Sequence, residues 1–322
     1  MKELVNFIKR KSSLFFLFLG LAILVALLCY MDFSVIAESF SMVGNKIFLV
    51  FAVAALWIVC NTLCVSTLVN HKVPFYHLLY NQVTGDGYNV ITPFAGLGGE
   101  PYKIKHLTNW LSLDEASETI MRDRLIHSLS GIIYTCLTLW VVIFFVPVEK
   151  ALFIGFIVFG IVLTIFSVLL SLIILSDKPN KYLGKIMKKM KLLKEFKSNP
   201  LKRSIFLKAL FYKLLGRVLN MLEFVVIFML LGIQPELLEI VTIAAMLALS
   251  GTFLFIIPQG IGVNEAGISG AFQLIGKPVE LGLGVGLIRR ARVLFWALFG
   301  IAIHLSVLFY RNILLKKQRE KN

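Results

Sequence analysis

Charged residues are scarce in this chain. Only 16% of its 322 residues are Asp, Glu, Lys or Arg, whereas soluble globular domains carry about 25%. Apolar residues make up 58% of the chain, and several apolar runs approach the roughly 20 residues that cross a bilayer as a helix. The alternating pattern of a membrane-spanning β-barrel is missing. The composition therefore leaves no room for a soluble catalytic domain and predicts an all-α, polytopic integral membrane protein.

Cysteine and histidine are also few. The four cysteines lie inside apolar runs without metal-ligand spacing to histidine, so we interpret them as reduced packing residues. We predict neither a metal site nor a cofactor. His127 and His304 stand alone in apolar runs and are interpreted as packed imidazoles. The N-terminal run is preceded by basic residues but not followed by a small-residue cleavage site, which predicts an uncleaved first span.

Acidic residues are the scarcer charged class. The 18 Asp and Glu stand against 33 Lys and Arg, which gives a formal net charge of +15. The basic residues lie between apolar runs rather than on a soluble face with interleaved aromatics, so no nucleic-acid partner is predicted. Segment 177–208 holds eleven Lys or Arg, and basic clusters beside a membrane attract anionic lipid. A role in setting topology alone explains this segment equally well.

The apolar runs predict about six full spans. The runs are Leu14–Met31, Ile47–Val69, Leu125–Val146, Ala151–Leu175, Ala209–Leu231 and Leu281–Tyr310. A further run, Leu237–Ile257, belongs to segment 237–276, which is predicted to enter and leave the membrane on the outer side; a second crossing by Ile261–Ile275 is the competing solution. The whole chain, 1–322, is interpreted as one transmembrane domain with halves 1–176 and 209–322 around the cytoplasmic loop 177–208.

The positive charges orient these spans. Basic residues gather before the first span, in the gap after Val69, in the loop 177–208 and after Tyr310, while the alternate gaps carry few of them. Because cytoplasmic loops are enriched in Lys and Arg, both termini are expected to lie in the cytoplasm. We expect a multi-pass protein of the cytoplasmic (inner) cell membrane.

A short pattern occurs twice and is the most informative feature. The letters are ITPFAGLGGE at 91–100 and IIPQGIGVNE at 256–265, and in both a Glu follows a Pro by seven positions. Proline removes a backbone donor and glycine is a poor helix former, so each segment is predicted to break a helix. The predicted breaks lie at Pro93, Gly96, Gly98, Gly99, Pro258, Gly260 and Gly262. Upstream of the first copy, Gly85-Asp86-Gly87 predicts a kink or turn.

The two copies fall in gaps assigned to opposite sides of the membrane. This is an inverted repeat, a pattern that in transporters places two interrupted helices at one site near the midplane. Broken backbone is tolerated in a bilayer only where it is buried in protein or lines a wet cavity. We therefore predict two re-entrant broken helices, with a chance match of short Pro-Gly patterns as the alternative.

Charged side chains near the breaks are the candidate substrate-binding residues. A half-helix is expected to begin at each break, with Asn264 as a cap in the second, and such helix ends attract anions. Glu100 and Glu265 are expected either to satisfy their own helix ends or to pair with a cation that a substrate phosphate displaces.

Arginines in the apolar runs supply the candidate phosphate ligands. Arginine binds phosphate through a bidentate fork and is costly in hydrocarbon. We therefore add Asp123, Arg124, Arg217 and Arg289 to the candidate site. Arg290 and Arg292 interrupt the same apolar run as Arg289 and are further candidate cations, but Arg290 or Arg292 is expected to reach toward the outer interface instead.

These residues resemble the lysylphosphatidylglycerol synthase transmembrane-region family, in its YbhN-type form without the soluble synthase domain. The resemblance is carried by 92–101, by the Arg-Asp-Arg at 122–124 that opens the third span, and by 258–266, and it extends over nearly the whole chain. Two positions depart from the family pattern: Gln259 stands where Gly is usual, and Asn264 where a basic residue is common. The resemblance implies lipid translocation, because in two-part relatives this domain flips the lipid that a soluble domain makes.

The leading hypothesis is a flippase-like transporter of an anionic or polyprenyl-linked lipid, and not an enzyme. Glu100 and Glu265 would control access, while Arg124 and Arg289 would hold phosphate. One alternative is a membrane-embedded enzyme that acts on a lipid carrier. Another is an accessory scaffold in lipid-linked glycan or cell-envelope synthesis, either as a homo-oligomer or with an envelope-synthesis partner.

Overall fold

The computed structural model describes residues 22–29, 33–92, 98–175, 201–253 and 257–319, and every regular element in these ranges is a helix. The elements are α2 (Phe33–Val43), η1 (Gly44–Lys46), α3 (Ile47–Leu68), α4 (Phe75–Ile91), α5 (Glu100–Leu107), α6 (Leu113–Phe145), α7 (Lys150–Leu175), α9 (Arg203–Leu230), α10 (Leu237–Phe253), η2 (Pro258–Gly260), α11 (Val263–Leu274) and α12 (Val279–Arg319). The predicted all-α class is confirmed. Most of the predicted first span and of the basic loop, and the predicted breaks Pro93 and Gly96, lie outside the described residues.

Four described stretches are long and apolar enough to cross a membrane: Ser34–Leu68, Leu113–Phe145, Lys150–Ser171 and Val279–Tyr310. The chain is therefore a membrane protein by the length and composition of its helices. Helix α9 has 28 residues, but Lys213, Arg217 and Glu223 interrupt its apolar character. The total of six spans stays a prediction.

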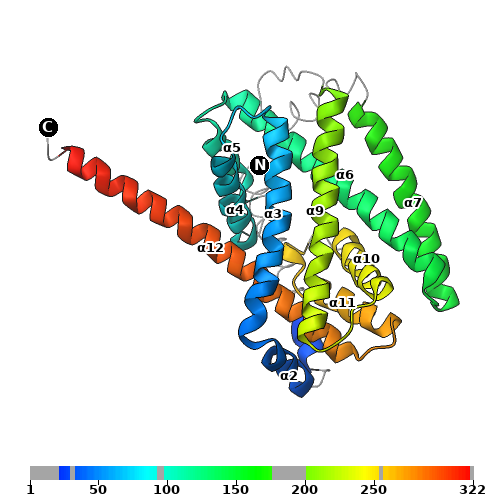
Figure 1. Cartoon of the computed structure of the whole chain (residues 1–322). Coiled ribbons are helices and arrows are strands. Elements are labelled where there is room, and N and C mark those ends of the chain that lie inside the picture. The colour runs from blue at the N-terminus through cyan, green and yellow to red at the C-terminus, as the bar shows by residue number, and fades with distance from the viewer. Residues whose placement is uncertain (1–21, 30–32, 93–97, 176–200, 254–256, 320–322) are drawn as a thin grey trace, which may run out of the picture.

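The long helices run between two ends of the molecule, as Figure 1 shows for α3, α7 and α9. The short pair α4 and α5 lies toward the upper end in this view, and the pair α10 and α11 lies toward the lower end. Helix α12 crosses the bundle obliquely and continues beyond it at its C-terminal end. The two broken-helix segments thus belong to opposite ends of the bundle, as an inverted arrangement requires.

Helix α6 begins twelve residues before the predicted start of the third span. Ser112 and Glu115 form a capping box: the Glu115 N–H donates to the Ser112 side chain at 3.2 Å, and the Ser112 N–H donates to the Glu115 carboxylate at 3.1 Å. Such a box satisfies otherwise unpaired groups at a helix start. Residues 122–124 therefore lie inside a helix rather than at its beginning, because hydropathy marks the apolar part of a helix and not its polar extension.

Two broken-helix elements are present where the repeated pattern lies. The first consists of α4 and α5 with residues 92–99 between them, and the second consists of α10, η2 and α11. With 12 residues, α11 is shorter than the roughly 20 needed to span a bilayer. Whether segment 237–276 is re-entrant or crosses the membrane twice stays a prediction.

The backbone of the second break shows why glycine is usual at position 259 in the family pattern. Gln259 has φ +54°, a left-handed conformation that glycine adopts most easily. The expected cap at Asn264 is wrong, because Gly262, with φ +77°, precedes the first residue of α11. Asn264 lies inside the helix, where its Nδ2 donates to the Gln259 carbonyl at 3.3 Å.

Gly85 and Gly87 do not form the predicted kink, because both lie within the continuous helix α4. A Cβ at Gly85 would lie 2.3 Å from the Lys103 side chain, and one at Gly87 would lie 2.8 Å from the Ala297 carbonyl oxygen. These glycines therefore permit close packing of α4 against α5 and α12 rather than a bend.

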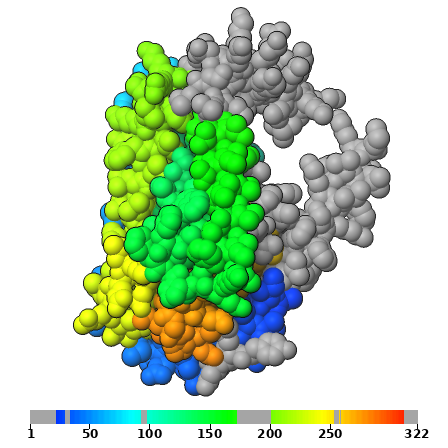
Figure 2. All heavy atoms as spheres, turned by 90° about the vertical axis from the view of Figure 1, so that its right-hand side faces the viewer, coloured from blue at the N-terminus to red at the C-terminus, as the bar shows by residue number. Residues whose placement is uncertain are grey.

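The outer face of the bundle is apolar. Figure 2 shows α7 along the middle of the face turned to the viewer, with α9 and α10 at its side. Val158, Val162, Ile165 and Phe166 of α7 are all exposed. A continuous exposed apolar surface of this kind is typical of helices that contact lipid.

Close contact between α4 and α12 predicts the effect of enlarging Gly300. A Cβ at Gly300 would lie 2.4 Å from the Val83 carbonyl oxygen, whereas a Cβ at Gly155 in α7 has no neighbour within 4 Å. We expect Gly300→Ala to lower the free energy of unfolding by about 1–3 kcal/mol through overpacking. Gly155→Ala should have no effect or stabilise its helix by up to about 1 kcal/mol. Unfolding of the detergent-solubilised protein with SDS measures both; equal effects would contradict the described packing.

Candidate functional site

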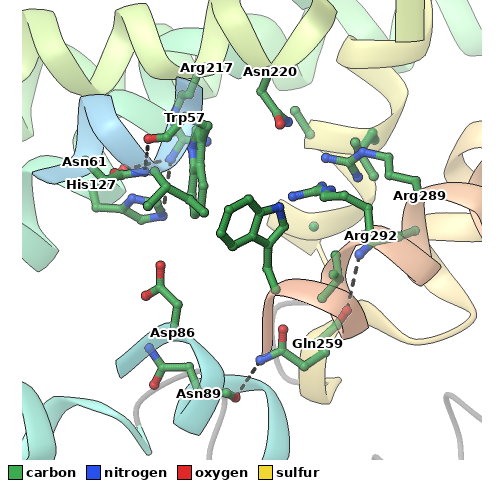
Figure 3. Close-up of a pocket in the computed structure, with 18 of the residues that line it drawn as sticks. Trp57, Asn61, Asp86, Asn89, His127, Arg217, Asn220, Gln259, Arg289 and Arg292 are labelled. Atoms are coloured by element: carbon green, nitrogen blue, oxygen red, sulfur yellow. Dashed lines mark hydrogen bonds between the residues drawn. The ribbon is translucent and has the colours of Figure 1, made fainter. Parts of the chain in front are cut away.

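A cavity of about 570 Å³ lies where the two broken-helix elements and the long helices meet. Side chains from both halves of the chain line it, and many of them are charged. Figure 3 shows Asp86 and Asn89 on one side, Arg217 and Asn220 on a second and Arg289 and Arg292 on a third. Charge is costly inside a membrane protein, so the pairing of each group decides what the cavity can bind.

The first broken-helix element supplies a buried lysine. Gly85 leaves space for the Lys103 side chain, which is only 3% exposed as a residue. Its Nζ lies 2.8 Å from Asp86 Oδ1 and donates to Gln82 Oε1 at 3.4 Å. Lys103 therefore joins α5 to α4 beside the cavity, and its charge is balanced by Asp86.

Glu100, the first residue of α5, forms an ion pair with Arg124 of α6. Glu100 Oε1 also accepts a hydrogen bond from Asn89 Nδ2 at 3.3 Å, while Asn89 Oδ1 accepts one from the Gly99 N–H at 2.7 Å. The first break is thus held by one amide side chain and one ion pair. The other carboxylate oxygen of Glu100, Oε2, is buried and makes no hydrogen bond to a residue that the structure describes.

A second buried ion pair joins α9 to α6. Lys213 Nζ lies 2.7 Å from Asp123 Oδ1 and donates to Asn61 Oδ1 at 2.8 Å. Asp123 Oδ1 also accepts from Cys64 Sγ at 3.5 Å. Both charged side chains are almost completely buried, so the partners compensate each other's desolvation.

In the second broken-helix element, Glu265 satisfies the start of its own helix and also pairs with a cation, while displacement of that cation by a phosphate stays a prediction. Its Oε2 accepts the Gly262 N–H at 2.8 Å, which satisfies the start of α11. The same carboxylate accepts from Arg290 Nε at 2.9 Å and from Arg290 Nη2 at 3.0 Å. Arg290 also donates to the carbonyls of Gln259 and Gly260 at 3.0 and 3.2 Å. The expectation that Arg290 reaches toward the outer interface is therefore wrong, because its guanidinium closes the second break.

Glu223 of α9 is completely buried and contacts two arginines of α12. Arg292 donates to it through Nε at 2.9 Å and Nη2 at 3.1 Å, and Arg289 donates through Nε at 3.0 Å. The Arg289 guanidinium also lies 5.3 Å from the centre of the Phe224 ring, within cation–π range. Arg292 is 8% exposed, so its predicted outward orientation is also wrong.

Arg217 has no carboxylate within ion-pair distance among the residues that the structure describes. Its Nε donates to Ser130 Oγ at 3.1 Å and its Nη2 to the His127 carbonyl at 2.9 Å. Gly131 makes this position possible, because a Cβ there would lie 2.9 Å from Arg217 Nη2. The guanidinium is held in place by neutral groups, and its charge is not balanced by an acid.

The two broken-helix elements meet directly. Gln259 Nε2, in the second break, donates to the Asn89 carbonyl of α4 at 2.7 Å. The bond crosses the edge of the cavity, as Figure 3 shows. The sequence pattern predicted that the two elements converge, and the described residues do converge at this contact.

Five of the six predicted site residues line the cavity, and the sixth, Glu100, pairs with one of them. The structure brings Glu100 together with Arg124, but it pairs Glu265 with Arg290 rather than with Arg289, the predicted phosphate ligand on the same helix. Sequence reasoning missed Lys103, Asp86, Lys213, Glu223 and Arg290. Isolated charges within helical apolar segments are the signal that would have found Lys213 and Glu223. His127, expected only as a packed imidazole, lines the cavity beside Arg217.

The fold and the site define a helical membrane protein with a charged internal cavity between two broken helices. The family model described as the lysylphosphatidylglycerol synthase TM region matches residues 17–301. Because the match covers most of the chain, the protein belongs to this family, which connects it with lipid synthesis or translocation at a membrane. A comparison with curated proteins returned no significant match.

The shared contact at Glu223 predicts a large loss of stability when its charge is removed. Glu223→Gln would leave Arg289 and Arg292 without their carboxylate, and breaking a buried pair costs about 3–5 kcal/mol. We expect a corresponding fall in the free energy of unfolding, measured by SDS titration in micelles. Glu236→Gln is the matched control, since Glu236 is exposed and outside the cavity. A Glu223→Gln protein as stable as this control would show that the two arginines are compensated elsewhere.

Proposed function

We propose that this protein moves a phosphate-bearing lipid across the cytoplasmic membrane without changing the lipid chemically. The observation that carries the proposal is the charged cavity of about 570 Å³ bounded by both broken-helix elements. Buried charge in a membrane protein is expensive and marks the pathway of a polar group. The apolar outer surface is suited to leave the acyl or polyprenyl tails in the bilayer while the headgroup enters the cavity.

The ion pairs at the two breaks suggest how the headgroup could open its path. Glu100–Arg124 ties the first element to α6, and Glu265–Arg290 ties the second to α12. A phosphate competes with carboxylate for a guanidinium, because arginine binds both through the same bidentate geometry. A phosphate that displaced one carboxylate would release one element while the other stayed tied. Alternating release would expose the cavity to one side at a time.

The distribution of basic residues along the sequence supports this proposal. In our proposal both termini lie in the cytoplasm, and the basic loop 177–208 attracts anionic lipid to that face. No nucleic-acid partner is proposed. The proposed partner is an anionic phospholipid or a polyprenyl-phosphate lipid.

A reconstituted translocation assay tests the proposal. We expect vesicles with the purified protein to move a fluorescent phospholipid from the inner leaflet to the outer leaflet, where dithionite quenches it. The double variant Glu100→Ala and Glu265→Ala should lower the rate by about tenfold or more, because both breaks lose the group that pairs with arginine. The matched control is Glu236→Ala, which changes an exposed carboxylate that does not line the cavity.

Two further measurements separate this proposal from its rivals. Mass spectrometry of the vesicle lipids should find the substrate chemically unchanged; turnover would indicate a membrane-embedded enzyme. A double variant as fast as the unmodified protein would remove the roles of both glutamates. Absence of movement together with a stoichiometric co-purifying partner would indicate a scaffold.

A further inference from the structure

The cavity carries more positive than negative charge. Seven cationic side chains line it: Lys103, Arg124, Lys213, Arg217, Arg289, Arg290 and Arg292. Five carboxylates, some of them just behind the cavity wall, pair with these cations: Asp86, Glu100, Asp123, Glu223 and Glu265. With histidine counted as neutral, two positive charges are left over among the residues that the structure describes.

The geometry at Glu223 identifies the first surplus cation as Arg289. Arg292 binds Glu223 through two parallel contacts, from Nε to one oxygen and from Nη2 to the other. This bidentate arrangement is the strong form of the arginine–carboxylate pair. Arg289 reaches the same carboxylate only through Nε, at 3.0 Å. Its two terminal amino groups make no hydrogen bond to a described residue, so four N–H donors are available.

Arg217 is the second surplus cation. Its Nε and Nη2 are occupied by Ser130 and His127, which are neutral acceptors. Its Nη1 makes no hydrogen bond to any residue that the structure describes. This guanidinium is therefore fixed in position while one edge remains available to an anion.

The two surplus cations face the same part of the cavity. Arg217 and Asn220 are three residues apart on α9, so they share a face of that helix. Figure 3 shows Asn220 between Arg217 and Arg289 at the cavity wall, which all three residues line. Asn220 lines the cavity and makes no hydrogen bond to another described residue, so its Nδ2 group is available to donate to a ligand there. A neutral donor beside two surplus cations indicates a site for an oxygen-rich anion.

We propose that this part of the cavity selects a group with two negative charges, a phosphomonoester or diphosphate, over the singly charged phosphodiester of common phospholipids. A phosphomonoester carries about −1.5 to −2 at neutral pH, since its second pKa is near 6. It therefore balances Arg217 and Arg289 together, whereas a phosphodiester leaves one of them uncompensated. The inference rests on the proposed lipid function but names the charge class of the headgroup.

The test compares two ligands that differ by one charge. Farnesyl phosphate is a monoester, and its methyl ester is a diester with the same hydrocarbon chain. We expect isothermal titration calorimetry of the full-length protein in a nonionic detergent, at pH 8, to show about tenfold or more tighter binding of the monoester, because the second charge adds a charge-assisted contact. Titration into empty micelles corrects for partitioning. Equal affinities for the two ligands would overturn the inference.

Substitutions assign the preference to the two arginines. Arg217→Gln and Arg289→Gln should each reduce the monoester-to-diester ratio to near one, and Arg217→Lys should keep most of it because the charge is retained. Lys277→Gln is the matched control, since Lys277 pairs with Glu239 and does not line the cavity. An unchanged ratio in Arg217→Gln would refute the assignment even if Arg289→Gln failed to fold.

Inorganic phosphate identifies the source of the dianion. If inorganic phosphate displaces farnesyl phosphate when the two are at similar concentrations, the site belongs to a soluble dianion. If inorganic phosphate must be present at about tenfold or higher concentration than farnesyl phosphate, the site belongs to a lipid. The result of this binding test can be distinguished from the result of the translocation assay. Translocation of a diester lipid without a binding preference would remove this inference alone, whereas a binding preference without translocation would remove only the proposed function.

Discussion

Charge that is removed from water must be compensated nearby, and this constraint connects the helices around the cavity. Following the ion pairs leads from α4 to α5 at Lys103, from α5 to α6 at Glu100, and from α6 to α9 at Asp123. The series continues from α9 to α12 at Glu223 and from α12 to α11 at Glu265. The few charged residues of these helices thereby determine which helices contact one another around the cavity.

Gln259 closes this series of contacts. Its side chain donates to the Asn89 carbonyl, so η2, next to α11, is joined back to α4. A neutral hydrogen bond contributes about 0.5–1.5 kcal/mol, less than a buried ion pair costs to break. Among the described contacts, the direct junction between the two broken-helix elements is therefore weaker than the junction of either element with its long helix. The two elements can separate from each other without losing an ion pair.

The sequence predicted the helices better than the pairing of charges. Apolar runs located α3, α7 and α9 because burial in lipid imposes both length and composition. The repeated Pro-Gly pattern located both breaks for a similarly local reason. Pairings such as Lys213 with Asp123 join residues far apart in the chain, and no local pattern specifies which cation meets which acid. Arg290 was assigned outward for this reason, since its partner Glu265 is brought to it only by the folding of α11 against α12.

Because Arg289 and Arg290 lie on the same helix, α12, any movement of that helix displaces both of them. Arg289 and Arg290 are consecutive on α12, yet they contact Glu223 of α9 and Glu265 of α11 respectively. Successive side chains on an α-helix project about 100° apart, since 3.6 residues complete a turn. Turning or sliding α12 displaces both guanidinium groups by the same motion. A single movement of α12 therefore changes both the ion pair that closes the second break and the position of the Arg289 charge in the cavity. No intermediary residues are required to couple these two changes.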